Sequence, residues 1–116
     1  MSEITIYHNP RCSKSRASLA LLEDNGIVPE IVLYQESPLN RATLSTLLTK
    51  LDMKASELVR RGEADFKEAG LSRASTEQEV LEAMVERPKL IERPIVVKGD
   101  RAVLGKPPEN VLELVG

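Results

Sequence analysis

The order of apolar segments in the first 35 residues is the feature that most restricts what this chain can fold into. Residues Ile4–Tyr7 (ITIY) are a short β-favouring run, a helical pattern starts at Ser13, and a second β-favouring run covers Glu30–Gln35. Asn25-Gly26 supplies residues that tolerate the left-handed conformation with which many helices end. A strand–helix–strand unit favours parallel strands joined by a right-handed crossover. This segment therefore predicts an α/β fold.

Two details of this segment can be tested against a structure. The helical spacing rests on three apolar residues, and we expect these to form the buried face: Ala17, Ala20 and Leu21. We also expect the strand Ile4–Tyr7 to be buried on both faces of the sheet.

The middle of the chain predicts helices only. Asn40 is a suitable N-cap for a helix whose apolar face carries four leucines, namely Leu44, Leu47, Leu48 and Leu51. Residues Ala55–Gly70 predict two short helices broken at Gly62. A further helix is expected to begin at Ser75, with Gln78 completing a capping box, and to stop at Pro88. Its predicted core residues are Val80, Leu81 and Met84.

The last part of the chain returns to strands. Residues Arg93–Pro108 contain two apolar runs around a Gly-Asp turn, which predicts an antiparallel hairpin, and Glu109–Val115 predicts a final helix. The complete order is βαβ, a helical block, then ββα. This is the layout of a thioredoxin-like fold, a four-stranded mixed sheet, with helices inserted at about residues 39–89 of a single domain spanning 1–116. That fold keeps a cis-proline facing its reactive thiol, and Pro94 occupies the corresponding place.

Composition excludes several classes of function. The formal charge of −2 over 116 residues gives no reason to expect nucleic-acid binding, which usually requires a strongly basic domain. No apolar run approaches the roughly 20 residues of a membrane span, and no signal peptide is visible. We therefore expect a cytoplasmic protein without membrane or nucleic-acid partners.

The single cysteine lies between the first strand and the first helix. At a helix N-terminus, the sulfur of Cys12 would meet free backbone N–H groups and the positive end of the helix dipole. Arg11, Lys14 and Arg16 add positive charge, which also favours a thiolate and an incoming oxyanion. The alternative is an inert buried cysteine, which such polar neighbours disfavour.

Spacing restricts the chemistry of this thiol further. A CxxC pair would need a second cysteine at Ser15, and a phosphatase-type Cys-x5-Arg loop would need arginine at Ser18. Cys12 and His8 fall short of the three or four ligands of a metal site, so we expect no metal. A second thiol must come from outside. His8 could favour the thiolate or only cap the strand.

Four segments resemble the glutaredoxin-linked arsenate reductases over essentially the full length of the chain. These segments are ITIYHNPRCSKSR, LVRR (Leu58–Arg61), ERPIVV (Glu92–Val97) and LGKPPENVL (Leu104–Leu112). The resemblance implies that Cys12 attacks arsenate to form a thiol–arsenate adduct. Glutathione, a co-substrate rather than a bound cofactor, then reduces the arsenic and leaves a mixed disulfide that glutaredoxin resolves.

The resemblance also implies roles for individual residues. Arg60 and Arg93 match two of the family's three oxyanion-binding arginines, and the third position is Lys106 here. Lysine is a compact point charge without the planar fork of arginine. The family also uses the hydroxyl of Ser15 at the adduct and His8 to favour the thiolate. From the sequence alone, a solvated helix residue is the usual outcome for an arginine such as Arg60 or Arg61.

Two other functions fit the same residues. One is a glutaredoxin-like thiol–disulfide oxidoreductase that acts on another substrate. The other is a regulatory binding module of the kind that contacts RNA polymerase with this fold, although those regulators carry the CxxC pair that Ser15 interrupts here.

Overall fold

The first strand lies inside a four-stranded mixed sheet. Its order is β2-β1-β3-β4, in which β1 runs parallel to β2 and antiparallel to β3, and β3 pairs antiparallel with β4. The strands are β1 (Ile4–Tyr7), β2 (Glu30–Val32), β3 (Ile95–Lys98) and β4 (Arg101–Leu104). The predicted parallel crossover, the hairpin and the α/β fold class are confirmed.

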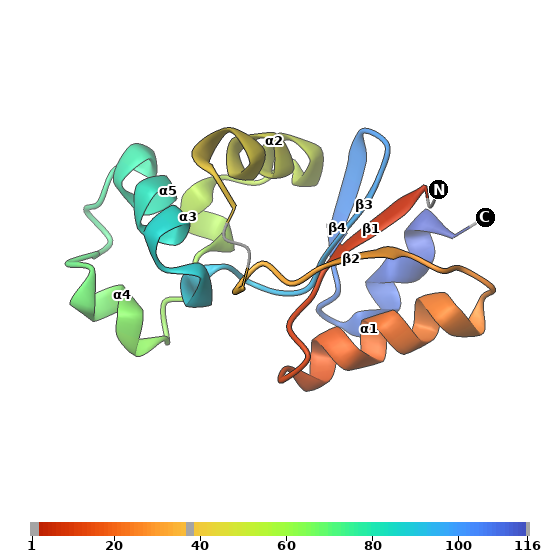
Figure 1. Cartoon of the computed structure of the whole chain (residues 1–116). Helices are drawn as coiled ribbons and strands as arrows, with labels where there is room; N and C mark the ends of the chain where they lie inside the picture. The colour runs from red at the N-terminus through yellow and green to blue at the C-terminus, as the bar shows by residue number, and fades with distance from the viewer. Residues whose placement is uncertain (1–2, 37–38, 116) are drawn as a thin grey trace. The chain divides into compact units, whose positions relative to one another are not determined.

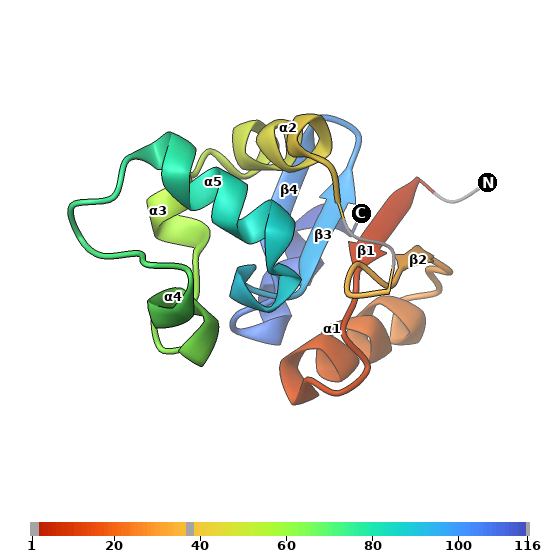
Figure 2. The same cartoon turned by 60° about the vertical axis from the view of Figure 1, so that its left-hand side comes forward.

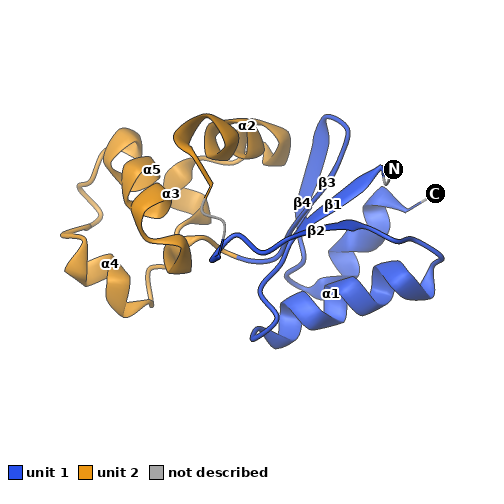
Figure 3. Cartoon of the chain, viewed as in Figure 1, with its two compact units in different colours: residues 1–37, 93–116 blue, residues 38–92 orange. Residues whose placement is uncertain are grey.

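The structure is a computed structural model that describes residues 3–36 and 39–115. The chain divides into two compact units, one of residues 1–37 with 93–116 and one of residues 38–92 (Figure 3). The first unit holds the whole sheet, and the second is helical. That the two form one domain with an insertion at about residues 39–89 stays a prediction.

Helix α1 (Ser13–Asp24) begins where it was predicted, but its buried face differs from the prediction. Ala17 and Ala20 are exposed, whereas Ser15, Ser18 and Leu22 are buried. The hydroxyls of both serines are hydrogen-bonded, so burying them carries no unpaired polar group. The spacing of apolar residues could not predict this face, because two of its three buried residues are serines.

The second strand is shorter than predicted. It ends at Val32, and the N–H of Glu36 donates to the carbonyl of Leu33 at 3.0 Å, so Leu33–Glu36 form a turn. In β1, Ile4 and Ile6 are buried, but Thr5 and Tyr7 are half-buried. The expectation of burial on both faces is therefore wrong for that strand.

The core of the first unit lies on one face of the sheet. Helix α1 and the 3₁₀ helix η2 (Pro108–Leu114) pack against each other, and η2 also packs on β3 and β4 (Figure 1). The buried side chains of this core are Ile4, Ile6, Leu22, Val96, Val111 and Leu114. The last helix is thus 3₁₀ rather than the regular helix expected for Glu109–Val115, and it starts at a proline.

The second unit contains the remaining helices, with α5 packed against both α2 and α3 (Figure 2). The elements are α2 (Arg41–Leu51), α3 (Ala55–Leu58), α4 (Ala64–Glu68), α5 (Glu77–Glu86) and η1 (Pro88–Leu90). Asn40 caps α2 as predicted, through a 2.7 Å bond from the N–H of Thr43. No helix in the described part of the chain is long and apolar enough to cross a bilayer.

The start of α5 is one residue later than predicted. Thr76, not Ser75, is the N-cap: its hydroxyl accepts from the N–H of Glu79, and the Glu79 carboxylate accepts from the N–H of Thr76. Serine and threonine are adjacent here, as are the glutamine and glutamate three residues on. Both registers therefore fit the capping-box pattern, and the sequence does not distinguish them.

The start of β3 is fixed by close packing around Pro94. The Arg93–Pro94 bond is cis, as the fold assignment predicted, and the Lys106–Pro107 bond is also cis. The N–H of Gly105 donates to the carbonyl of Pro94 at 2.9 Å. A Cβ on Gly105 would lie 2.6 Å from Cγ of Pro94 and would overlap Oγ of Ser18. Gly105 thus lets strand β4 end directly against the proline and the helix.

We predict that Gly105→Ala destabilises the protein by about 1–3 kcal/mol, because neither the proline ring nor the buried serine can move away freely. Urea unfolding followed by circular dichroism measures this. The matched control is Gly62→Ala, whose new Cβ would meet nothing within 4 Å. Equal midpoints for Gly105→Ala and wild type would contradict the packing described here.

Candidate active site

The loop between β1 and α1 is held by its own polar groups. The carbonyl of Asn9 accepts from the N–H of Cys12 at 3.0 Å, and its side-chain oxygen accepts from the N–H of Arg11 at 3.0 Å. The guanidinium of Arg16 donates to the carbonyl of Pro10 at 2.8 Å. Arg16, predicted as a supporting cation, therefore ties the loop to the first turn of α1. Asn9 was not predicted, although Asn-Pro is a turn-forming pair.

Ser15 and His8 form a buried pair beneath this loop. Nδ1 of His8 lies 2.6 Å from Oγ of Ser15, which also accepts from the N–H of Asn9 at 3.0 Å. Burial, followed by the charge of Arg16, lowers the pKa of His8, so the imidazole is neutral at pH 7. A neutral ring adds no positive charge near the thiol. In this structure His8 contacts Ser15, and the predicted roles of His8 at the thiolate and of Ser15 at an adduct stay predictions.

Cys12 is the N-cap of α1 and is half-buried. Its backbone is extended and its side chain caps nothing, so the sulfur is free to meet the first amides of the helix. Partial burial raises the pKa of the Cys12 thiol. The backbone N–H of Ser15, the guanidinium of Arg93 and the N–H of Lys14 outweigh this and leave the pKa below its ordinary value. The thiol is thus poised as a nucleophile.

Arg93 supplies the positive charge that the sequence analysis assigned to the neighbours of Cys12. It precedes Pro94 at the start of β3, and its guanidinium lies within reach of the Cys12 sulfur. Its Nε and Nη1 atoms are buried and have no hydrogen-bond partner within residues 3–36 and 39–115. Two buried donor atoms of this half-buried cation are therefore available beside the thiol. An oxyanion is the ligand that such a fork accepts best.

The other two predicted anion-binding residues, Lys106 and Arg60, lie in different units of the chain. Lys106 lies in the first unit, is exposed, and precedes the second cis-proline. Arg60 belongs to the second unit, where its guanidinium is 3.1 Å from Glu63 and 3.9 Å from Glu92. Its N–H donates to the carbonyl of Leu90 at 2.7 Å. The structure therefore brings Arg93 to Cys12, while the oxyanion-binding roles of Arg60 and Lys106 stay predictions.

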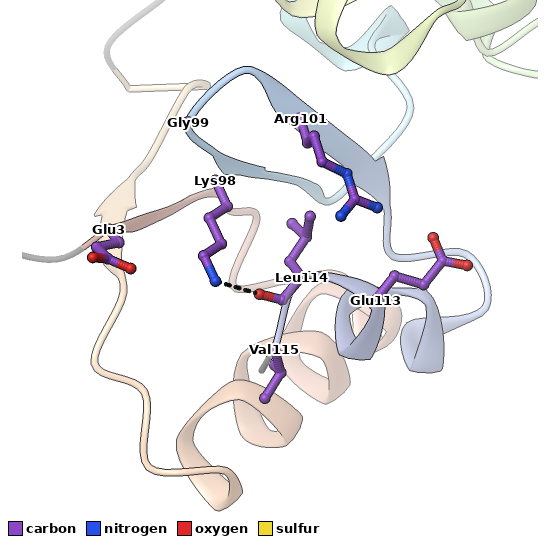
Figure 4. Close-up of a pocket in the computed structure, with 7 residues that line it drawn as sticks. All are labelled: Glu3, Lys98, Gly99, Arg101, Glu113, Leu114 and Val115. Carbon is purple, nitrogen blue, oxygen red and sulfur yellow. Dashed lines mark hydrogen bonds between the residues drawn. The ribbon is translucent and has the colours of Figure 1, made fainter.

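Two hollows flank the sheet of the first unit. One of about 280 Å³ adjoins the cysteine loop and is lined by His8, Asn9, Pro10, Arg11, Leu33, Gln35 and Glu36. The other, about 540 Å³, lies at the opposite end of the strands, where Glu3 precedes β1 and Lys98 ends β3 (Figure 4). Lys98 there donates to the carbonyl of Leu114 at 3.2 Å. None of the described residues that line the second hollow is a cysteine, whereas the first hollow adjoins the loop that carries Cys12.

A family model described as the ArsC family matches residues 7–114. The chain belongs to the ArsC family. It is 54% identical to the uncharacterised protein YfgD of Escherichia coli (strain K12), over 98% of each chain. It is 42% identical to an arsenate reductase of Neisseria meningitidis serogroup A, over 96% of this chain and 97% of that protein.

A comparison with solved structures confirms the fold. The solved structure of an arsenate reductase from Vibrio cholerae superposes with a TM-score of 0.92 at 43% identity, covering 97% of each chain. The predicted thioredoxin-like α/β fold and the predicted family are therefore both confirmed.

We predict that alkylation of Cys12 by iodoacetamide shows a pH midpoint below about 8.5, the pKa of a free cysteine. Arg93→Met should raise that midpoint, since it removes the cation that lowers the pKa of Cys12. Once the pKa of the thiol exceeds the pH of the assay, each further pKa unit lowers the thiolate fraction, and with it the alkylation rate, roughly tenfold. The pH profile of the alkylation rate measures both.

The matched control is Arg11→Gln, which removes an exposed cation next to Cys12 in the sequence. Its midpoint should move far less than that of Arg93→Met. A larger shift of the midpoint in Arg11→Gln than in Arg93→Met would mean that the basic residues next to Cys12 in the sequence, rather than Arg93, lower the pKa of the thiol.

Proposed function

We propose that this chain is an arsenate reductase in which Cys12 is the nucleophile and glutathione and glutaredoxin supply the electrons. The observation that carries the proposal is the Cys12 sulfur, whose pKa is lowered, beside the two unpartnered nitrogens of Arg93. The site thus pairs a nucleophile with a cation that can hold a tetrahedral anion. Relatives named arsenate reductase at 42% identity support this substrate.

The proposed chemistry has three steps. The Cys12 thiolate attacks arsenic(V), and an oxygen leaves as water after protonation, which gives the thiol–arsenate adduct. A glutathione thiolate then attacks the Cys12 sulfur. The sulfur–arsenic bond breaks with its electron pair remaining on arsenic, so arsenite leaves and Cys12 carries a mixed disulfide. Glutaredoxin attacks the glutathione sulfur and releases the Cys12 thiolate.

The need for external thiols follows from the sequence, which contains one cysteine. The 280 Å³ hollow beside the loop offers space for a small co-substrate. Arg11 and Glu36 line it with charges of both signs, and glutathione carries both carboxylates and an ammonium group. The hollow therefore suits that tripeptide near the thiol it must attack.

Oxyanion binding is proposed to involve Arg93 first, with Arg60 and Lys106 as the other two cations implied by the family resemblance. Lys106 departs from the family's arginine. A lysine contacts a tetrahedral anion through one charged nitrogen, whereas arginine can donate two parallel hydrogen bonds. We therefore expect weaker arsenate turnover than an arginine would give.

Thiol–disulfide exchange on another substrate is the second candidate, and the observation that favours it is this lysine. A site with a weakened grip on the anion still retains an activated thiol. The two functions differ in the requirement for arsenate. A thiol transferase consumes NADPH with a glutathionylated peptide, in the presence of glutaredoxin and glutathione reductase, whether or not arsenate is added.

We predict arsenate-dependent NADPH consumption when the protein is coupled to glutathione, glutaredoxin and glutathione reductase. Cys12→Ser should abolish it, because a hydroxyl at neutral pH is not a comparable nucleophile. Lys106→Arg should raise it several-fold by restoring the bidentate donor. Initial rates against arsenate concentration measure these effects.

Absence of turnover in both the wild type and Lys106→Arg would overturn the reductase proposal. NADPH consumption with a glutathionylated peptide and without arsenate, above the rate that glutaredoxin and glutathione reductase give without this protein, would favour the thiol transferase.

A further inference from the structure

Tyr34 carries a buried hydroxyl that the fold leaves without a partner. The residue lies in the turn after β2, and its side chain is 1% exposed. Its hydroxyl has no hydrogen-bond partner among the residues that the structure describes. Buried polar groups in proteins are nearly always paired, so an unpaired one needs a reason. If only stability mattered, phenylalanine would be the better residue at this position, because it fills the same space without burying an unpaired hydroxyl.

The position of Tyr34 supplies such a reason. Its hydroxyl lies close enough to Arg93 and Cys12 for both of their charges to act on it. Nε and Nη1 of Arg93 are buried and unpartnered in the same way. Three donor groups without acceptors therefore lie together beside one nucleophilic sulfur. All three belong to the first unit, so this juxtaposition is internal to it.

The hydroxyl remains a donor throughout the working range of the protein. Burial, partly offset by the charge of Arg93, raises the pKa of Tyr34 to about 12. The phenol is thus neutral and protonated at any pH at which Cys12 reacts. A neutral donor on a rigid ring adds a hydrogen bond at low entropic cost. It also adds no further cation beside Arg93.

We propose that the Tyr34 hydroxyl donates a hydrogen bond to the oxyanion substrate at Cys12, beside Arg93, and is a substrate-binding residue. The inference rests on the proposed function, because it assumes that the ligand is a tetrahedral oxyanion. The Tyr34 hydroxyl would be a neutral donor beside the cations proposed to bind the oxyanion. Arg93 lies just before β3 and Tyr34 lies in the turn after β2, so the two donors come from separate segments of the first unit.

The test measures binding apart from turnover. Sulfate is a tetrahedral anion that this chemistry does not reduce, and it should protect Cys12 from iodoacetamide at constant ionic strength. Tyr34→Phe should raise the half-protecting concentrations of sulfate and arsenate about tenfold or more, the usual effect of losing a hydrogen bond to a charged group. Its alkylation midpoint without anion should equal that of the wild type.

Tyr7→Phe is the matched control. It removes the same hydroxyl from the chain's other tyrosine, which is half-buried in β1 and whose pKa is raised by burial and then by Glu30. Its half-protecting concentrations should match those of the wild type. The urea midpoint of Tyr34→Phe should be no lower than that of the wild type, because the buried hydroxyl has no hydrogen-bond partner among residues 3–36 and 39–115.

The outcomes separate the two proposals. Equal protection in wild type and Tyr34→Phe overturns this inference and leaves the reductase proposal intact. A raised alkylation midpoint or a lowered urea midpoint in Tyr34→Phe also overturns it, because the hydroxyl would then serve the thiolate or the fold. No protection of wild-type Cys12 by either anion overturns the oxyanion site itself, and this inference with it.

Discussion

The attraction between the Arg93 guanidinium and the Cys12 sulfur is the interaction on which the candidate site depends. Half-burial alone would raise the pKa of the thiol and leave it protonated. The arginine and the first amides of α1 reverse that effect. Both partners are held by neighbours, since Asn9 and Arg16 fix the loop and Pro94 fixes the start of β3. These contacts hold the loop that carries the sulfur and the strand start that carries the cation.

The succession of strands along the chain could be predicted from the sequence because apolar runs and turn residues mark each strand. The face of α1 could not, because it is chosen by contacts far along the chain. Ala17 and Ala20 look like core residues but are exposed, whereas Ser18 is buried because Gly105 and Pro94 pack on it. The spacing of apolar residues in a helix indicates which residues are polar. It does not indicate which small residue a strand far along the sequence will pack against.

The site was predictable in part for the same reason. Cys12 stood out from its place before a helix, and the family resemblance added Arg93. The strength of that pairing depends on sheet register, because β1 and β3 pair Tyr7 with Ile95 and so bring the residues just beyond them together. Tyr34 gave no signal, since a tyrosine at the end of a strand is ordinary. The proposal for Tyr34 rests on a buried hydroxyl without a partner in the described part of the chain, which the sequence does not show.

The contact of Gly105 with Ser18 has a consequence for how sequences of this fold can diverge. The two positions share one volume, since a single added carbon on the glycine would meet the serine oxygen. A larger residue at 105 therefore requires changes at both 18 and 94, because the added carbon would also meet the ring of Pro94. The three sites should change in concert between lineages. Directed-evolution libraries that randomise position 105 alone would sample few folded sequences, whereas randomising the three positions together would give more of them.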